Sequence, residues 1–467
     1  MQFNNCQHDS ASVLATAEKL KGINEKLNAV VTFCNVEDQL KDHPRDGRLA
    51  MVPIALKDNV STKGIKTTAS SRILDNYVPI YDATIVKKLR EAGAVTLAKT
   101  SMDELGMGGT NLNAYTGKVN NPYDFERITG GSSGGSAALV ASGAVAMAIG
   151  TDTGDSVRKP ACYCGVVGVK PTYGRISRYG IIPYASSLDH VGYFTTCIDD
   201  AALTLEVLAG RDDRDMTSSN QPVEAYSQLI NSDLTGKKIG IIRNVYDAIS
   251  DERINAEFDK LVDKMKASGA IVEDVYFDKR YMDALLPTYY VISNAEATAN
   301  HSNLDGIRFG MREEGADLKE VMINSRTKGF SSSVRKRFVI GSYSLFVENQ
   351  EKLFRKAQRV RRVIVAALKD KLADYDVLMA SAAGTLAPHP EDSFDEKLTD
   401  TYLVAENHML LGNFSGYPSI SLPNALIDGL PTGINLLAKP FDEVNMLSVA
   451  KGIETLTGLV GLTKEVR

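Results

Sequence analysis

Apolar side chains recur along the chain with two different periods, and each period predicts one kind of element. Over residues 10–33 a spacing of three and four predicts one or two helices ahead of the first strand. Residues 251–268 repeat this spacing, with an apolar face made by Ile254, Phe258, Leu261, Val262 and Met265. Residues 52–56 instead alternate larger apolar residues with smaller ones, which is typical of a buried strand.

Helical patterns are followed directly by strand patterns at several places. The pairs are 84–92 with 94–98, 137–142 with 145–149, and 251–268 with 270–275. The last third adds helices around 334–372 and strands over 376–380, 419–423 and 433–437. Alternation of this kind predicts an α/β fold with a mixed sheet. The polar stretch over residues 210–236 is rich in turn formers, so it is either an internal boundary or a long surface connection.

Composition narrows the class of protein. With 43% hydrophobic and 24% charged residues the chain has the composition of an ordinary globular protein. A net charge of −5 argues against a general nucleic-acid-binding surface. No basic leader with an apolar run begins the chain, and no stretch reaches about 20 apolar residues. Five cysteines form no CxxC pair, so we expect a soluble protein of a reduced compartment, the cytoplasm. They are Cys6, Cys34, Cys162, Cys164 and Cys197.

The densest chemistry lies over residues 130–174, which hold the run GGSSGGS and a second Gly/Ser/Asp turn at 151–156. Small residues expose backbone N–H groups, which suits a loop that stabilises a developing negative charge. A flexible linker is not normally followed at once by an apolar segment. A phosphate-binding loop would end in Lys-Ser/Thr, and this run does not. We interpret the stretch as an active site in which serines perform the chemistry.

A serine nucleophile needs a base, and none of the six histidines lies in a catalytic motif. Lysine can serve instead when burial lowers its pKa enough to keep it neutral. Lys57 follows the buried strand over residues 52–56 and is the best candidate. The plainer alternative is a lysine that extends from the end of the strand into solvent.

These segments together resemble the amidase signature family, whose members use a Ser, cis-Ser, Lys triad. The resemblance is carried by ALKDNV, GGSSGGS and TDTGDSVRKPACYCGVVGVKPTYGR. It implies Ser156 as nucleophile, Ser132 as bridging serine and Lys57 as base, at intervals of 24 and 99 residues that match the family's spacing. It also implies that the backbone N–H groups of Thr153, Gly154, Asp155 and Ser156 line the oxyanion hole.

The resemblance further implies one large domain over residues 1–467, with a mixed sheet covered by helices on both sides. Its parts would be N-terminal helices over 1–50, the signature core over about 51–210, the connection over about 210–236, and a C-terminal part over 237–467. One departure stands out: Asp155 occupies a position where the family usually has glycine. We expect its carboxylate to point away from the oxyanion, toward Arg158 or Lys159.

The second half resembles one branch of that family, the glutamine-hydrolysing A subunits of tRNA-dependent amidotransferases. The matching stretches are YYVISNAEATAN, LDGIRFG, VRKRFVIGSYSL and LPTGINLLAKPFDE. The resemblance implies Arg337 for the glutamine α-carboxylate, Glu406 for the α-amino group, and Tyr289 near the site. Without it, Arg337 reads as one member of a solvated cluster with Arg335 and Lys336. Two departures are Ala-Ser-Ala-Ala-Gly at 380–384, where the branch has Gly-Pro-Thr-Ala-Pro, and Glu406 in place of a shorter aspartate.

The same resemblance implies a heterotrimer with B and C subunits that amidate Glu-tRNA(Gln), with Asp-tRNA(Asn) left open as a second target. In that assembly the tRNA is contacted mainly by the B subunit, while ATP and Mg are used by a partner chain. It implies no cofactor or metal in this chain. Two alternatives stay open: a stand-alone amidase for another small amide, and a catalytically silent scaffold, which Asp155 suggests.

Overall fold

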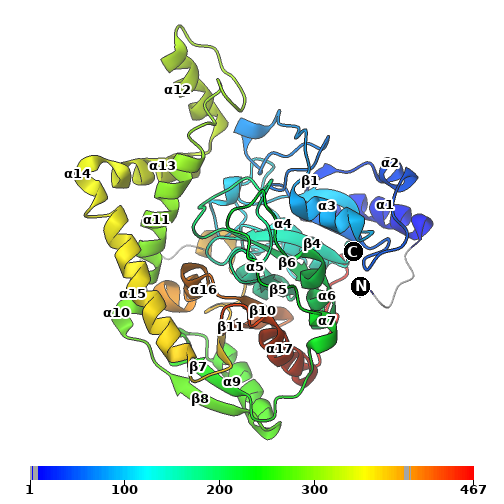
Figure 1. The fold of residues 1–467 in the computed structure, drawn as a ribbon, viewed down its shortest axis with the longest axis vertical. Coiled ribbons are helices and arrows are strands. Elements are labelled where there is room, and N and C mark those ends of the chain that lie inside the picture. Colours follow the sequence, from blue (N-terminus) through cyan, green and yellow to red (C-terminus); the bar gives the residue numbers. More distant parts are fainter. Residues whose placement is uncertain (1–2, 4–8, 394–398, 400, 467) are drawn as a thin grey trace.

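The computed structural model describes residues 3, 9–393, 399 and 401–466, so Cys6 lies outside the described residues. One mixed sheet of eleven strands runs through it, in the order β1-β3-β2-β4-β6-β5-β10-β11-β9-β7-β8 (Figure 1). The strands are β1 Val30–Phe33, β2 Pro53–Lys57, β3 Val95–Thr100, β4 Met147–Asp152, β5 Val167–Lys170, β6 His190–Thr195, β7 Lys238–Ile242, β8 Ile271–Val275, β9 Val377–Ser381, β10 Ser419–Ile427 and β11 Leu430–Ala438. Strand β2 pairs in parallel with β3 and β4, and β7 in parallel with β8 and β9, whereas the other pairs are antiparallel.

Helices cover both faces of this sheet. Alternate residues of a strand join different cores, since neighbouring side chains point to opposite faces. Thus Ile54 of β2 packs in one cluster and Ala55 in another, and the same holds for Met379 and Leu378 of β9. The first face carries α3 Thr84–Glu91, α6 Ile198–Leu208, α7 Tyr226–Leu229, α9 Glu252–Ala267 and α17 Glu443–Thr457. The second carries α1 Ser10–Leu27, α4 Gly134–Ala141, α5 Arg158–Cys164, α11 Leu285–Asn300, α13 Ser332–Leu345, α15 Phe354–Leu372 and α16 Leu410–Ser415.

The remaining helices are short or lie away from the sheet. They are α2 Val36–Lys41, α8 Arg243–Ala248, α10 Lys279–Asp283, α12 Leu318–Gly329 and α14 Val347–Gln350. In Figure 1, α12 stands at the far end of a helical arm that α11 and α13 connect to the body of the molecule. No helix within the described ranges has the length and apolar character that crossing a membrane requires.

The predicted α/β class with a mixed sheet is confirmed, and the five apolar residues of the face of α9 are all buried. The prediction of helix up to residue 33 is wrong. Helix α1 ends at Leu27 because Asn28 adopts a left-handed conformation with φ 51° and caps it by donating its N–H to the Asn24 carbonyl. Residues 30–33 then pair with β3 as an edge strand. Strand β5 pairs with β10, so strands from before and after residues 210–236 share one sheet.

Candidate active site

Two glycine-rich turns lie side by side at the ends of β2 and β4. The first contains the cis peptide bond Gly131–Ser132, and α4 starts two residues later at Gly134. Residue 131 must be glycine because a Cβ there would collide with the carboxylate of Asp103. The N–H of Ser133 donates to the carbonyl oxygen of Ser156 at 3.1 Å. This bond holds the turn of Ser132 against the turn of Ser156.

Lys57 is the last residue of β2 and is completely buried. Its Nζ lies 2.7 Å from Ser132 Oγ, 2.8 Å from Ser133 Oγ and 3.3 Å from the carbonyl oxygen of Thr151. Burial lowers the pKa of Lys57 to about 7, against an opposing pull from three nearby aspartates, Asp103, Asp152 and Asp189. The alternative of a lysine extending into solvent is therefore wrong.

Two other lysines are also fully buried, Lys99 and Lys170, so burial alone does not identify the base. Lys99 lies 3.5 Å from an Asp58 carboxylate oxygen and donates to the Thr67 hydroxyl, while Lys170 donates to backbone carbonyls. Within the described ranges, Lys57 alone among these three contacts serine hydroxyls. Its partners, not its burial, make it suited to receive a proton from a serine.

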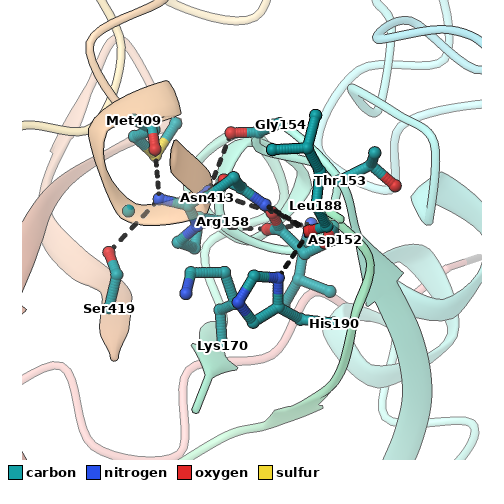
Figure 2. A network of polar contacts seen from close by, with 12 residues as sticks. Asp152, Thr153, Gly154, Arg158, Lys170, Leu188, His190, Met409, Asn413 and Ser419 are labelled. Carbon is teal, nitrogen blue, oxygen red and sulfur yellow. Dashed lines mark hydrogen bonds and ion pairs between the residues drawn. The ribbon is translucent and has the colours of Figure 1, made fainter. Parts of the chain in front are cut away.

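The turn that carries Ser156 is anchored by a buried ion pair (Figure 2). Arg158 binds Asp152 with two nitrogens, at 2.9 Å and 3.1 Å, and also donates to the Gly154 carbonyl at 2.8 Å. Asn413 of α16 joins both charged groups, accepting from Arg158 at 2.6 Å and donating to Asp152 at 2.9 Å. Burial would raise the pKa of Asp152, but Arg158 outweighs it and holds that pKa well below its usual value. Both ends of the turn are thus fixed by charges that satisfy each other.

Backbone N–H groups of this turn are available to a substrate. Within the described ranges, the N–H groups of Thr153, Gly154, Asp155 and Ser156 donate to no protein acceptor. The Thr153 side chain is held by Asp189 at 2.7 Å. A Cβ on residue 154 would lie 3.1 Å from the ring of Tyr289 and from Leu410, so glycine lets these side chains close over the turn. Free donors in a buried turn are what an oxyanion hole requires.

Beside this turn opens a cavity of about 780 Å³, whose lining includes Asp155, Tyr289, Arg337 and Glu406. Ser156 itself is 4% exposed and lies directly after Asp155. Arg337 of α13 donates to the Tyr184 hydroxyl at 3.0 Å and stacks over the ring of Tyr290, with 5.4 Å to the centroid. It has no carboxylate partner within the described ranges, whereas its neighbours Arg335 and Lys336 are exposed. The reading of Arg337 as part of a solvated basic cluster is therefore wrong.

Glu406 is engaged by the protein itself. Lys159 forms an ion pair with its Oε2, and Oε1 accepts from the Gly384 N–H at 2.7 Å and from the Thr385 hydroxyl at 3.1 Å. Tyr163 donates to Oε2 at 3.2 Å. The longer side chain reaches Lys159, so its charge is neutralised before any substrate arrives.

The surroundings of Asp155 differ from the expectation that its carboxylate points to Arg158 or Lys159. Arg158 is bound to Asp152 and Lys159 to Glu406, which leaves neither to pair with Asp155. Within the described ranges the Asp155 carboxylate has no hydrogen bond or ion pair. Burial raises the pKa of Asp155 to about 7, with Lys159 opposing that shift and Asp152 adding to it.

A family model described as Amidase matches residues 11–447. This chain belongs to the amidase family. The A subunit of the glutamyl-tRNA(Gln) amidotransferase of Fusobacterium nucleatum is 38% identical over 462 residues, which cover 96% of this chain and 93% of that protein. The crystal structure of the corresponding A subunit from Thermotoga maritima matches with a TM-score of 0.82 and 34% identity, over 97% of this chain and 94% of that one. The peptide amidase of Stenotrophomonas maltophilia matches with a TM-score of 0.81 and 26% identity, over 96% and 93%.

Sequence reasoning about this amidase missed several residues that position the site. Ser133 shares the Lys57 amino group with Ser132, and Asp152 and Asn413 hold the turn of Ser156 through Arg158. Asp152 stands inside the motif TDTGDSVRKP, four residues before Ser156, so its proximity could have been read from the sequence. Asn413 could not, because only the packing of α16 brings it there. No cluster of metal-binding side chains occurs within the described residues.

Proposed function

We propose that this amidase is the glutamine-hydrolysing subunit of a tRNA-dependent amidotransferase. It would release ammonia from glutamine and pass it to partner subunits that convert Glu-tRNA(Gln), and in some settings Asp-tRNA(Asn), to the amidated form. The observation that carries the hydrolytic part is the contact of buried Lys57 with Ser132 at 2.7 Å, beside the turn of Ser156. The similarity to the A subunits from Fusobacterium nucleatum and Thermotoga maritima supports the glutamine and tRNA part.

The chemistry follows from the groups at the two turns. Neutral Lys57 accepts the Ser132 proton, Ser132 accepts the Ser156 proton, and Ser156 Oγ attacks the side-chain amide carbon of glutamine. The oxygen that becomes negative is received by the free N–H groups of the 153–156 turn. Protonated Lys57 returns a proton through Ser132 to the leaving nitrogen, which departs as ammonia. Water then attacks the glutamyl ester by the same relay in reverse, releasing glutamate and restoring Ser156.

Arg337 supplies the recognition that a free amino acid needs. Its guanidinium has no acidic partner among the described residues and lines the cavity, so it can bind the α-carboxylate of glutamine. Tyr289 closes over Gly154 and limits the volume next to the nucleophile. The assembly that we propose is a heterotrimer with B and C subunits in the cytoplasm, in which a partner holds ATP and Mg and the B subunit makes most of the tRNA contact.

Ammonia release from glutamine tests this function. The purified chain is assayed alone and with B and C subunits, ATP and Glu-tRNA(Gln), beside a Ser156→Ala variant. We expect Ser156-dependent release that rises with the partners and the misacylated tRNA. Absence of glutamine turnover under every condition, with other amides still hydrolysed, would overturn it.

A stand-alone amidase is the second candidate, and one observation favours it. Glu406, which the resemblance assigns to the α-amino group, is already bound by Lys159, so the expected ammonium site is filled. Hydrolysis of small amides without α-amino groups, unaffected by Arg337→Gln, would support this candidate. A silent scaffold would instead gain hydrolysis strongly when Asp155 is replaced by glycine, whereas an active enzyme would not.

A further inference from the structure

Two opposite charges in the cavity lack internal partners. Six charged side chains line the cavity. Glu391 and Asp392 are exposed, and of the other four Lys159 and Glu406 neutralise each other. Arg337 and Asp155 are left, one cationic and one anionic, with no ion pair to any described residue. Two unmatched charges of opposite sign in one cavity are complementary to a zwitterion.

Asp155 is also placed where an unmatched carboxylate harms catalysis. It directly precedes Ser156, and its own N–H is one of the free donors of the turn. A negative charge beside a developing oxyanion raises the barrier, unless a cation reaches it when the substrate is bound. The two internal cations that act on Asp155, Arg158 and Lys159, form ion pairs with other acids. A cation that pairs with the ionised Asp155 carboxylate would therefore have to come from the substrate.

We propose that Asp155 binds the α-ammonium group of the amino-acid substrate, while Arg337 in the same cavity binds its carboxylate, and that Glu406 instead holds Lys159. This inference rests on the proposed function and names the specificity determinant of the same site. The substrate ammonium neutralises Asp155 on binding, so the oxyanion turn loses its unfavourable charge only when an amino acid is present. An amide that lacks this ammonium leaves the charge in place and reacts slowly.

The acidity of Asp155 agrees with this role. In the free chain burial raises the pKa of Asp155 to about 7, since Lys159 only partly opposes it and Asp152 and Glu406 add to it. A bound ammonium favours the ionised carboxylate and lowers that pKa. Binding of glutamine near pH 6 is therefore coupled to proton release and is weaker than at pH 8.

Substrate pairs test the proposal on the intact enzyme with its partner subunits. Glutamine is compared with 4-carbamoylbutanoate, which keeps the carboxylate and the amide but lacks the amino group. We expect the native chain to prefer glutamine in kcat/KM by at least about tenfold, the order of a hydrogen bond to a charged group. In Asp155→Asn, which keeps the backbone N–H, this preference should vanish, through a higher KM for glutamine and a faster reaction of 4-carbamoylbutanoate. Asp155→Gly is a second variant for the case that Asp155→Asn folds poorly, because glycine fits any backbone conformation.

Matched controls separate the carboxylates. Asp392→Asn removes an exposed acid that lines the same cavity and should leave the preference unchanged. A preference that survives both Asp155 variants but is lost in Glu406→Gln would overturn the assignment. So would equal rates for both substrates in the native chain. These outcomes keep Ser156-dependent glutaminase activity, whereas failure of the proposed function would appear as no glutamine turnover at all.

A binding measurement avoids turnover altogether. Calorimetric titration of glutamine into Ser156→Ala should show several-fold weaker binding at pH 6 than at pH 8, with proton release at pH 6. Adding Asp155→Asn should abolish both effects, because it removes the carboxyl group that titrates. The other charged groups that face this carboxyl remain unchanged in the variant; they are Lys159, Arg158, Asp152 and Glu406. Persistence of the pH dependence in the double variant would contradict the role of Asp155.

Discussion

Two neighbouring regions differ in how their charges are paired: the catalytic end, made by the turns around Lys57 and Ser156, and the substrate end, which is the cavity lined by Asp155 and Arg337. At the catalytic end Lys57 has three hydrogen-bond partners in the protein, and Asp152 and Arg158 bind each other. At the substrate end Arg337 and Asp155 have no internal counter-charge within the described residues. Groups that perform the reaction are oriented before the substrate binds, since reorganisation would raise the barrier. Groups that recognise a charged substrate acquire a counter-charge only when that substrate binds.

Removing the proposed base or the bridging serine should have the largest effect on activity. Lys57→Ala and Ser132→Ala should each lower kcat for ammonia release by about 10²–10⁴-fold, because general base catalysis is lost. Ser133→Ala should have a much smaller effect, since Ser133 also binds the Thr151 carbonyl at 3.1 Å and lies outside the relay. Equal losses in the two serine variants would show that the proton path through Ser132 is wrongly assigned.

Breaking the buried ion pair should affect stability more than recognition. Asp152→Asn leaves the Arg158 guanidinium buried without its counter-charge, which costs about 3–5 kcal/mol of unfolding free energy at pH 7. The Asp152 pKa is depressed in the folded chain, so its contribution is present above the usual aspartate pKa and is lost only in acid. Denaturant unfolding measures it. Asp213→Asn, with a side chain that is 93% exposed, is the control and should change little.

Removing the Arg337 cation tests recognition at the substrate end. Arg337→Gln should raise the KM for glutamine by about 10–100-fold, as expected for loss of a charge-assisted bond to the carboxylate. The value of kcat should change less, because Arg337 does not contact the proton relay. Arg335→Gln, on the exposed side of the same helix, should behave like the native chain. Steady-state kinetics that show no difference between these two variants would remove Arg337 from the site.

The pH profile should show the smallest and most gradual effect. Burial lowers the pKa of Lys57 to about 7, and only neutral lysine accepts a proton, so kcat/KM should fall about tenfold per pH unit well below 7 and level off above it. The ionisation of Asp155 contributes in the same range. Asp155→Asn separates the two, since it should leave the part that belongs to Lys57. A profile that is flat from pH 5 to pH 8 in that variant would mean that Lys57 is not the base.

Sequence patterns predicted most of the layered fold but not all element ends. The apolar face of α9 was readable because its period is purely local. The end of α1 was not, because it depends on the backbone conformation of Asn28 and on the pairing of β1 with β3. The order of the eleven strands also depends on long-range pairing, which no local period encodes.

The chemistry of the site was predicted from the sequence, because the motifs that carry Lys57, Ser132 and Ser156 resemble those of the amidase family. Only the tertiary structure decided which charges remain for a substrate. Lys159 pairs with Glu406 and Arg158 with Asp152, whereas Asp155 has no ion-pair partner in the described part of the chain, although all three lie within five residues. The physical reason is that Coulomb attraction depends on distance through space, and α16 and the segment of Glu406 reach this turn from about 250 residues away.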